Sequence, residues 1–261
     1  MRSALAALLL AGCVDTTGSA LVTFHAAAAG PSDATGALET DTSAGYHVSF
    51  TTATLHIGGV YLRLKQPAAG SQTQPCILPG QNYSGQVLDG LDVNLLSAEP
   101  QPFPNLGEGT ADASPIGEVW LVNGPVDADT DLTVIARLAG TATKGTTSIP
   151  FTAAFTISTD NRGINNGNPA QPGANPICKQ RIVTPITAGF APSEGGTLVV
   201  RADPRRWVTT TEFSDAPADP GVPGGVKFAD DNTTDDTSKF LFSAVRAAST
   251  YTLSFAPAPG P

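Results

Sequence analysis

Alternation of apolar and polar residues runs along most of this chain, and this is the pattern of β-strands that bury one face. In residues 46–51, for example, Val48 and Phe50 share one face while His47 and Ser49 share the other. Comparable strand patterns occur at residues 20–25, 46–51, 53–65, 86–88, 91–96, 117–122, 132–143, 149–158, 180–184, 197–203, 207–213 and 251–255. The pattern therefore predicts a protein built mainly of strands.

Three details of the pattern predict how the strands are arranged. The apolar phase of residues 53–57 shifts beyond Gly58 and Gly59, which indicates a bulge or a corner at the two glycines. Lys144 and Gly145 separate two alternating runs whose apolar residues would face each other in a hairpin. Residues 119–122 are apolar on both faces, so we expect a central strand that is covered on both sides.

A single helix is expected, over residues 237–248. A Thr or Ser can cap its start, and Leu241, Val245 and Ala248 form an apolar stripe with Phe240 beside it. The fold class predicted is all-β, an antiparallel β-sandwich with one short late helix. We expect a signal segment at residues 1–12, a tether at 13–19 and a single sandwich domain at 20–261.

The amino-terminal segment carries one positive charge at Arg2, then an apolar run, then the small residues Ala11 and Gly12 before Cys13. The run is much shorter than the roughly 20 residues that span a membrane as a helix. Its ending resembles the lipobox of bacterial lipoproteins. The resemblance implies that Cys13 is lipidated and becomes the first residue of the mature chain. An ordinary signal peptide cut elsewhere is the alternative.

The resemblance also implies where the protein resides. Two or three acyl chains anchor a protein stably, whereas one chain gives only marginal binding. The residue after Cys13 is Val14 and not Asp, which favours delivery to the outer membrane or cell surface over retention at the inner membrane. We therefore expect a membrane-anchored protein that is exposed to an oxidising compartment.

The other two cysteines, Cys76 and Cys178, form an even pair in loops rich in Pro and Gly. In an oxidising compartment a disulfide between them is the simplest interpretation. Metal ligation or a redox function is the alternative, although neither cysteine belongs to a Cys-x-x-Cys motif or has a His nearby.

Composition narrows the range of partners. The formal net charge is −9, which disfavours nucleic acid and anionic lipid headgroups as ligands. The chain also lacks the nucleophile-elbow, zinc-protease, P-loop and dinucleotide-binding motifs. We therefore predict no nucleic-acid binding and no enzyme activity, and an unknown protein or small ligand as the partner.

Two groups of side chains are candidates for chemistry. His25, His47 and His56 fall on strands expected to be adjacent, and imidazole is a common copper and zinc ligand. The alternative is that they are isolated polar-face histidines. The three arginines at 201, 205 and 206 could bind an anion, or could instead pair with Asp203 and neighbouring acids.

The strand patterns at residues 44–50 and 55–62, with the late segment 198–207, resemble those of secreted methanobactin-associated copper-binding proteins. That resemblance implies a periplasmic β-sandwich that binds copper through His and a modified Trp. It supplies no ligand motif, and Trp120 and Trp207 are more simply core or rim aromatics.

We therefore predict a cell-envelope lipoprotein that acts as a non-catalytic binding or structural module without a cofactor. One alternative is a periplasmic copper-binding protein that uses some of the three histidines. Another is a hydrolase of envelope glycan with paired carboxylates, a geometry that would reveal its mechanism.

Overall fold

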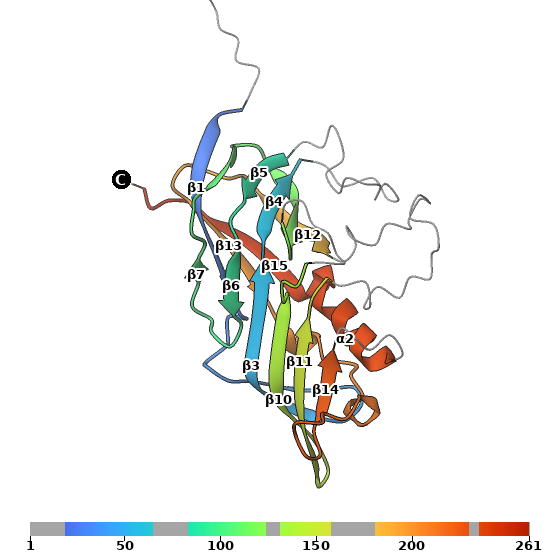
Figure 1. The fold of residues 1–261 in the computed structure, drawn as a ribbon. Coiled ribbons are helices and arrows are strands. Elements are labelled where there is room, and N and C mark those ends of the chain that lie inside the picture. Colours follow the sequence, from blue (N-terminus) through green and yellow to red (C-terminus); the bar gives the residue numbers. More distant parts are fainter. Residues whose placement is uncertain (1–18, 65–82, 124–130, 158–180, 230–234, 261) are drawn as a thin grey trace, which may run out of the picture.

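The structure is a computed structural model, and it describes residues 19–64, 83–123, 131–157, 181–229 and 235–260. Its described strands form two sheets, as the sequence predicted (Figure 1). No helix in these ranges is long and apolar enough to cross a membrane.

The larger sheet has nine strands. Its order is β12 (Ile182–Phe190), β9 (Ser114–Trp120), β4 (Gly59–Arg63), β5 (Tyr83–Val87), β8 (Gly107–Thr110), β1 (Leu21–Ala29), β13 (Thr197–Ala202) and β15 (Tyr251–Ala256), and β7 (Gln101–Pro102) pairs with β1. The sheet curls so that its two end strands pack together. Phe190 of β12 stacks on Phe255 of β15 with ring centroids 5.6 Å apart.

The smaller sheet has six strands. Its order is β14 (Val226–Ala229), β11 (Thr147–Phe155), β10 (Ala136–Lys144), β3 (His47–Ile57) and β2 (Leu38–Asp41), and β6 (Leu91–Asn94) also pairs with β3. The expected hairpin around Lys144 and Gly145 is confirmed, with Leu138 opposite Ala153. The sheets are mixed and not purely antiparallel, since β1 pairs with β13 and β11 with β14 in parallel.

The described helical segments are short. Helix α2 spans Asp236–Val245, and the 3₁₀ turns are η2 (Pro204–Arg206), η3 (Phe213–Asp215) and η4 (Ala248–Thr250). Asp235, and not a Thr or Ser, caps α2 by accepting from the backbone N–H groups of Thr237 and Ser238. Phe242 is buried and Phe240 is 68% exposed, so the expected place of Phe240 beside the apolar stripe was wrong.

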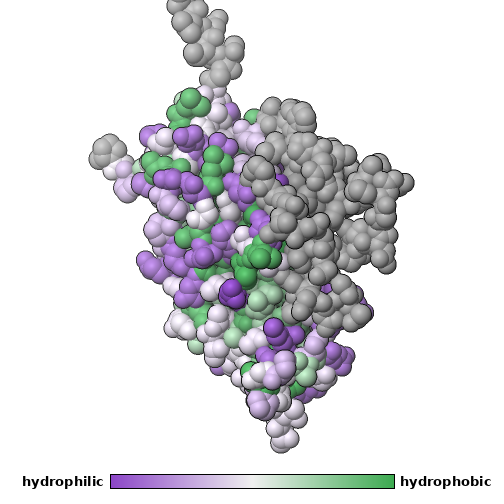
Figure 2. Space-filling view, in the orientation of Figure 1, coloured by the Kyte–Doolittle hydropathy of each residue, from purple (hydrophilic) through white to green (hydrophobic). Residues whose placement is uncertain are grey.

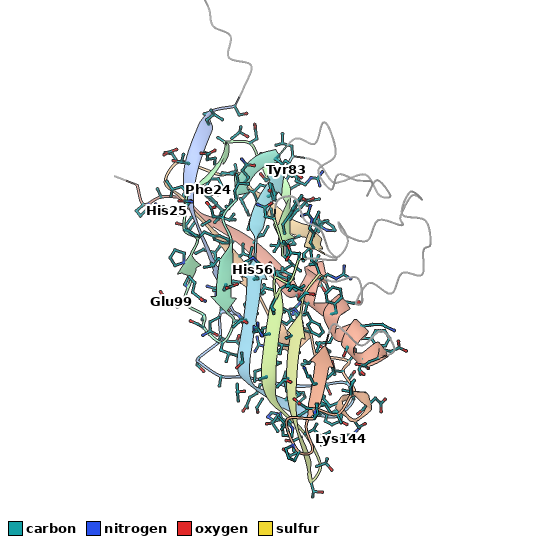
Figure 3. The ribbon with its side chains drawn as sticks, in the orientation of Figure 1. Phe24, His25, His56, Tyr83, Glu99 and Lys144 are labelled. Atoms are coloured by element: carbon teal, nitrogen blue, oxygen red, sulfur yellow. The ribbon has the colours of Figure 1, made fainter. Side chains whose placement is uncertain are left out.

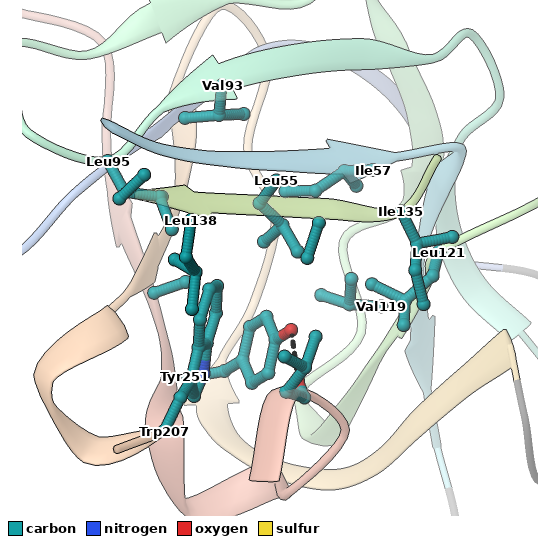
Figure 4. Packing of buried hydrophobic residues seen from close by; sticks show 14 of the residues in the cluster. Leu55, Ile57, Val93, Leu95, Val119, Leu121, Ile135, Leu138, Trp207 and Tyr251 are labelled. Atoms are coloured by element: carbon teal, nitrogen blue, oxygen red, sulfur yellow. Dashed lines mark hydrogen bonds between the residues drawn. The ribbon is translucent and has the colours of Figure 1, made fainter. Parts of the chain in front are cut away.

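One core fills the space between the inner faces of the sheets and α2. Figure 4 shows Leu55 and Ile57 of β3 facing Val119 of β9 and residue Leu121 just beyond it. Trp207 joins this core from a segment that the sequence pattern predicted as a strand, residues 207–213. That prediction was wrong, because the segment forms turns between η2 and η3. Its apolar residues are buried as the pattern required, but without strand pairing.

The corner predicted at Gly58 and Gly59 is confirmed, because β3 ends in the six-stranded sheet and β4 begins in the nine-stranded sheet. Gly58 donates its N–H to the carbonyl of Trp120 at 2.8 Å. A Cβ atom at Gly58 would lie 2.6 Å from the backbone N of Asn123 and 3.0 Å from the backbone of Val122. The chain therefore changes sheets where a side chain does not fit.

We predict that Gly58→Ala lowers the free energy of unfolding by about 1–3 kcal/mol, because the added methyl group meets backbone that cannot rotate away. Urea denaturation measures the change, and Gly260→Ala is the control since nothing lies within 4 Å of a Cβ there. Equal stability of the two variants would show that the corner is not closely packed.

Candidate functional site

The three histidines do not form a cluster. His47 and His56 both lie in β3, so the expectation that they occupy adjacent strands was wrong. They sit near opposite ends of that strand, about 30 Å apart at the usual rise of a strand. His25 belongs to β1 in the other sheet (Figure 3). His47 and His56 therefore cannot bind one metal ion together.

Each β3 histidine instead pairs with an aspartate on a neighbouring short strand. The Nδ1 atom of His47 lies 2.9 Å from Asp41 Oδ1 on β2, and that of His56 lies 2.7 Å from Asp92 Oδ1 on β6. Hydrogen bonding to Asp41, and then the charges of Asp41 and Glu39, raise the pKa of His47 above its usual 6.5. These contacts link β3 to its two edge partners.

Of the three late arginines, Arg205 pairs with acids, as the second interpretation stated, whereas Arg201 and Arg206 donate to backbone carbonyl oxygens. Arg205 binds Asp203 and forms two hydrogen bonds to Asp33, at 2.7 and 2.9 Å. Arg201 donates to the carbonyl oxygens of Gly30 and Ala98. An anion would have to compete with these partners.

A more elaborate arrangement lies on the nine-stranded sheet, on the face opposite the core. Side chains alternate along β4 and β9, so Val60, Leu62 and Val119 enter the core while Tyr61, Arg63, Glu118 and Trp120 point outward. These four outward side chains are nevertheless buried, with Trp120 only 1% exposed. This part of the sheet is therefore covered on both faces, as predicted for residues 119–122.

Three of these side chains, together with those of Arg181 and Tyr83, form a continuous series of contacts that we call the arginine–aromatic ladder. The guanidinium of Arg181 lies 4.8 Å from the Trp120 ring, and that ring lies 4.8 Å from Tyr61. Tyr61 is 4.9 Å from Tyr83, and the Arg63 guanidinium is 5.5 Å from the Tyr83 ring. A cation thus caps each end of three aromatic rings, a favourable placement over ring faces.

Glu118 binds two members of the ladder, Arg63 and Trp120. Its Oε1 accepts from Arg63 Nη1 and from Thr184 Oγ1, the latter at 3.4 Å, while its Oε2 accepts from Trp120 Nε1 at 3.2 Å. Glu118 is 2% exposed and Arg63 is 6% exposed, so this is a buried ion pair. Removing two charges from water is costly, and close geometry with additional hydrogen bonds is what offsets that cost.

The ladder keeps its phenols neutral. Burial raises the pKa of Tyr61, whose hydroxyl donates to Asn123 Oδ1 at 2.8 Å. Burial, and then the negative charge of Glu118, raise the pKa of Tyr83 to about 12. Neither phenol is therefore a phenolate nucleophile at neutral pH.

The chemistry open to this cluster is consequently limited. Both carboxylate oxygens of Glu118 already accept hydrogen bonds, so it is poorly placed to act as a general base. It is also the one buried carboxylate among the described residues, where the hydrolase alternative needs two acids. The same ranges contain no group of three or more His, Cys, Asp or Glu side chains arranged to hold a metal ion.

Several sequence predictions lie outside the described residues. These are the signal segment 1–12, the lipidation site Cys13, the tether 13–19 except for Ser19, and the cysteines Cys76 and Cys178 with their expected disulfide.

Comparison with known proteins adds no assignment. No family model matches the chain, and no curated protein and no solved structure is significantly similar to it.

The sequence pattern did not reveal the ladder, although one signal was present. Glu118 directly precedes residues 119–122, which were expected to be buried on both faces, and a buried carboxylate requires a cationic partner. The sequence does not show which arginine fulfils that requirement, because Arg63 and Arg181 are both remote in the chain.

We predict that Glu118→Gln lowers the free energy of unfolding by about 3–5 kcal/mol, because it leaves the Arg63 charge buried without its partner. Chemical denaturation of the variant tests this. Glu108→Gln, at an exposed position of β8, serves as the matched control and should change stability by less than about 0.5 kcal/mol. A loss below about 1 kcal/mol for Glu118→Gln would contradict a buried ion pair.

We predict that His47 titrates above 6.5 in an NMR pH titration, and that Asp41→Asn moves its midpoint back toward 6.5. Because the folded pKa is raised, the stabilisation by this pair is complete below pH 6.5 and is lost as pH rises through the folded pKa. Asp92→Asn, which removes the partner of His56, should leave the His47 midpoint unchanged. An unchanged midpoint in Asp41→Asn would disprove the pairing.

Proposed function

We propose that this chain is a lipid-anchored protein of the bacterial cell envelope that serves as a binding or structural module and not as an enzyme. The main support for this proposal is the short apolar run that ends at Leu10 and is followed by Ala11 and Gly12 directly before Cys13. A thiol at that position can form the thioether that carries the lipid, and the run itself is too short to anchor the chain as a helix.

The lengths of the chain segments suit this proposal. Cys13 lies six residues before Ser19, where the described structure begins, and six extended residues span about 20 Å. Strand β1 starts at Leu21 at one end of the molecule, and the hairpin of β10 and β11 projects at the opposite end (Figure 1). An anchor at Cys13 would hold the β1 end near the membrane and leave the hairpin free to meet a partner.

The surface and the site support binding rather than catalysis. On the face shown in Figure 2, hydrophobic residues form small patches among polar ones, as suits a surface exposed to water. The buried carboxylate Glu118 is fully engaged by donors, and the phenols of Tyr61 and Tyr83 stay protonated. Such a cluster gives rigidity to the sheet and supplies no free acid, base or nucleophile.

We predict that wild-type protein expressed in a bacterium incorporates an alkyne-labelled fatty acid and fractionates with membranes, whereas Cys13→Ser loses at least about 90% of the label because a hydroxyl cannot form the thioether. Cys76→Ser is the matched control and should keep the label. Mass spectrometry of the mature amino terminus should locate the lipid on Cys13. Unlabelled wild-type protein, or label that persists in Cys13→Ser, would refute the anchor.

A further inference from the structure

Two of the four tyrosines in the chain lie against each other, and all four belong to described residues. The rings of Tyr61 on β4 and Tyr83 on β5 have centroids 4.9 Å apart and an interplanar angle of 44°. Tyr46 packs against Phe213 instead, and Tyr251 donates its hydroxyl to the carbonyl of Val245. The chain therefore has one close tyrosine pair.

Trp120 extends this pair into a run of three rings that are easily oxidised. Its ring lies 4.8 Å from that of Tyr61, so Tyr61 contacts both Trp120 and Tyr83. Phenol and indole rings are among the side chains that lose one electron most readily. The electron vacancy left behind, or hole, moves quickly between rings in van der Waals contact. A vacancy created on any of the three rings can therefore reach the tyrosine pair.

The surroundings hold the two phenol rings in place. The hydroxyl of Tyr61 is bound to Asn123, and the guanidinium of Arg63 covers the Tyr83 ring. Tyr61 is buried, whereas Tyr83 is partly exposed and gives oxidants access. Radical coupling needs ring carbons next to the phenolic carbon to stay adjacent until a second electron is lost, and this packing keeps the rings together.

We propose that Tyr61 and Tyr83 are a site of oxidative cross-linking, at which a peroxide drives formation of one carbon–carbon bond between the two phenol rings. Each ring loses one hydrogen as a proton and an electron, from the carbon beside its phenolic carbon. The oxygen–oxygen bond of the peroxide takes up the two electrons and breaks. Hydrogen peroxide would thereby yield two molecules of water, and both phenolic hydroxyls are retained in the product.

This modification is independent of the lipid anchor and goes beyond the proposed function. The new bond would close the chain between Tyr61 and Tyr83 and tie β4 to β5, beside the ion pair of Arg63 and Glu118. A covalent bridge restricts the unfolded chain, so the cross-linked protein resists denaturation more than the free protein. Oxidation would then strengthen the sheet at the ladder.

The test is one-electron oxidation of the full-length protein with peroxodisulfate and a ruthenium photocatalyst. Peroxodisulfate is the peroxide in this reaction. Reduction, alkylation and trypsin digestion follow, which removes disulfides from the result. Trypsin cuts after Arg63 and Lys65, so Tyr61 and Tyr83 fall in different peptides. We expect one joined pair of these peptides, lighter than their sum by two hydrogens, and dityrosine fluorescence from monomeric protein.

Tyr83→Phe and Tyr61→Phe should each reduce this product at least tenfold, while Tyr46→Phe should preserve it. Circular dichroism confirms that each variant is folded, and wild-type protein oxidised in urea should lose the specific pair. Oxidation that yields only dimers or other tyrosine pairs, or an unchanged yield in Tyr83→Phe, would overturn the proposal. Tyr46 and Tyr61 fall in the same tryptic peptide, so fragmentation of the joined wild-type peptides must place the bond on Tyr61, and this decides the matter even if a variant does not fold.

Discussion

The buried ion pair between Arg63 and Glu118 is the interaction on which this part of the nine-stranded sheet depends. A charged carboxylate at 2% exposure is tolerated only with donors around it, and Glu118 accepts from side chains of β4, β9 and β12. In the pairing of β4 with β9, Tyr61 lies directly opposite Glu118. The pair therefore favours one register of these strands, since a one-residue slip would turn Arg63 toward the core.

The same constraint connects the fold to the proposed role. Where both faces of a strand are covered, polar groups must satisfy one another, and the result is a rigid region without a free catalytic group. A rigid sandwich on the proposed lipid tether would suit a module that presents a surface to a partner. The exposed His–Asp pairs of β3 attach two short edge strands to the sheet in the same way, though more weakly because water screens them.

The sequence pattern predicted the all-β class, the hairpin at Lys144 and Gly145, the glycine corner and the late helix, because each depends on local periodicity or a local turn. It did not predict the short strands β2, β7, β8 and β14, whose pairing comes from neighbours remote in the chain. A bulge near Thr51 lets one long strand keep both His47 and His56 on its polar face. The sequence pattern therefore resembled two separate strands. The sequence pattern did not reveal the ladder for a similar reason, since its members come from three strands, β4, β5 and β9, and from Arg181 just before β12.

The most direct test of this account is a double-mutant cycle with Arg63→Met, Glu118→Leu and the combined variant, measured by urea denaturation. The account predicts that each single change is strongly destabilising and that the double variant costs less than the sum of the two by at least about 2 kcal/mol, since an apolar pair leaves no buried charge. Costs that add to within about 0.5 kcal/mol would contradict it, because Arg63 and Glu118 would then be independent.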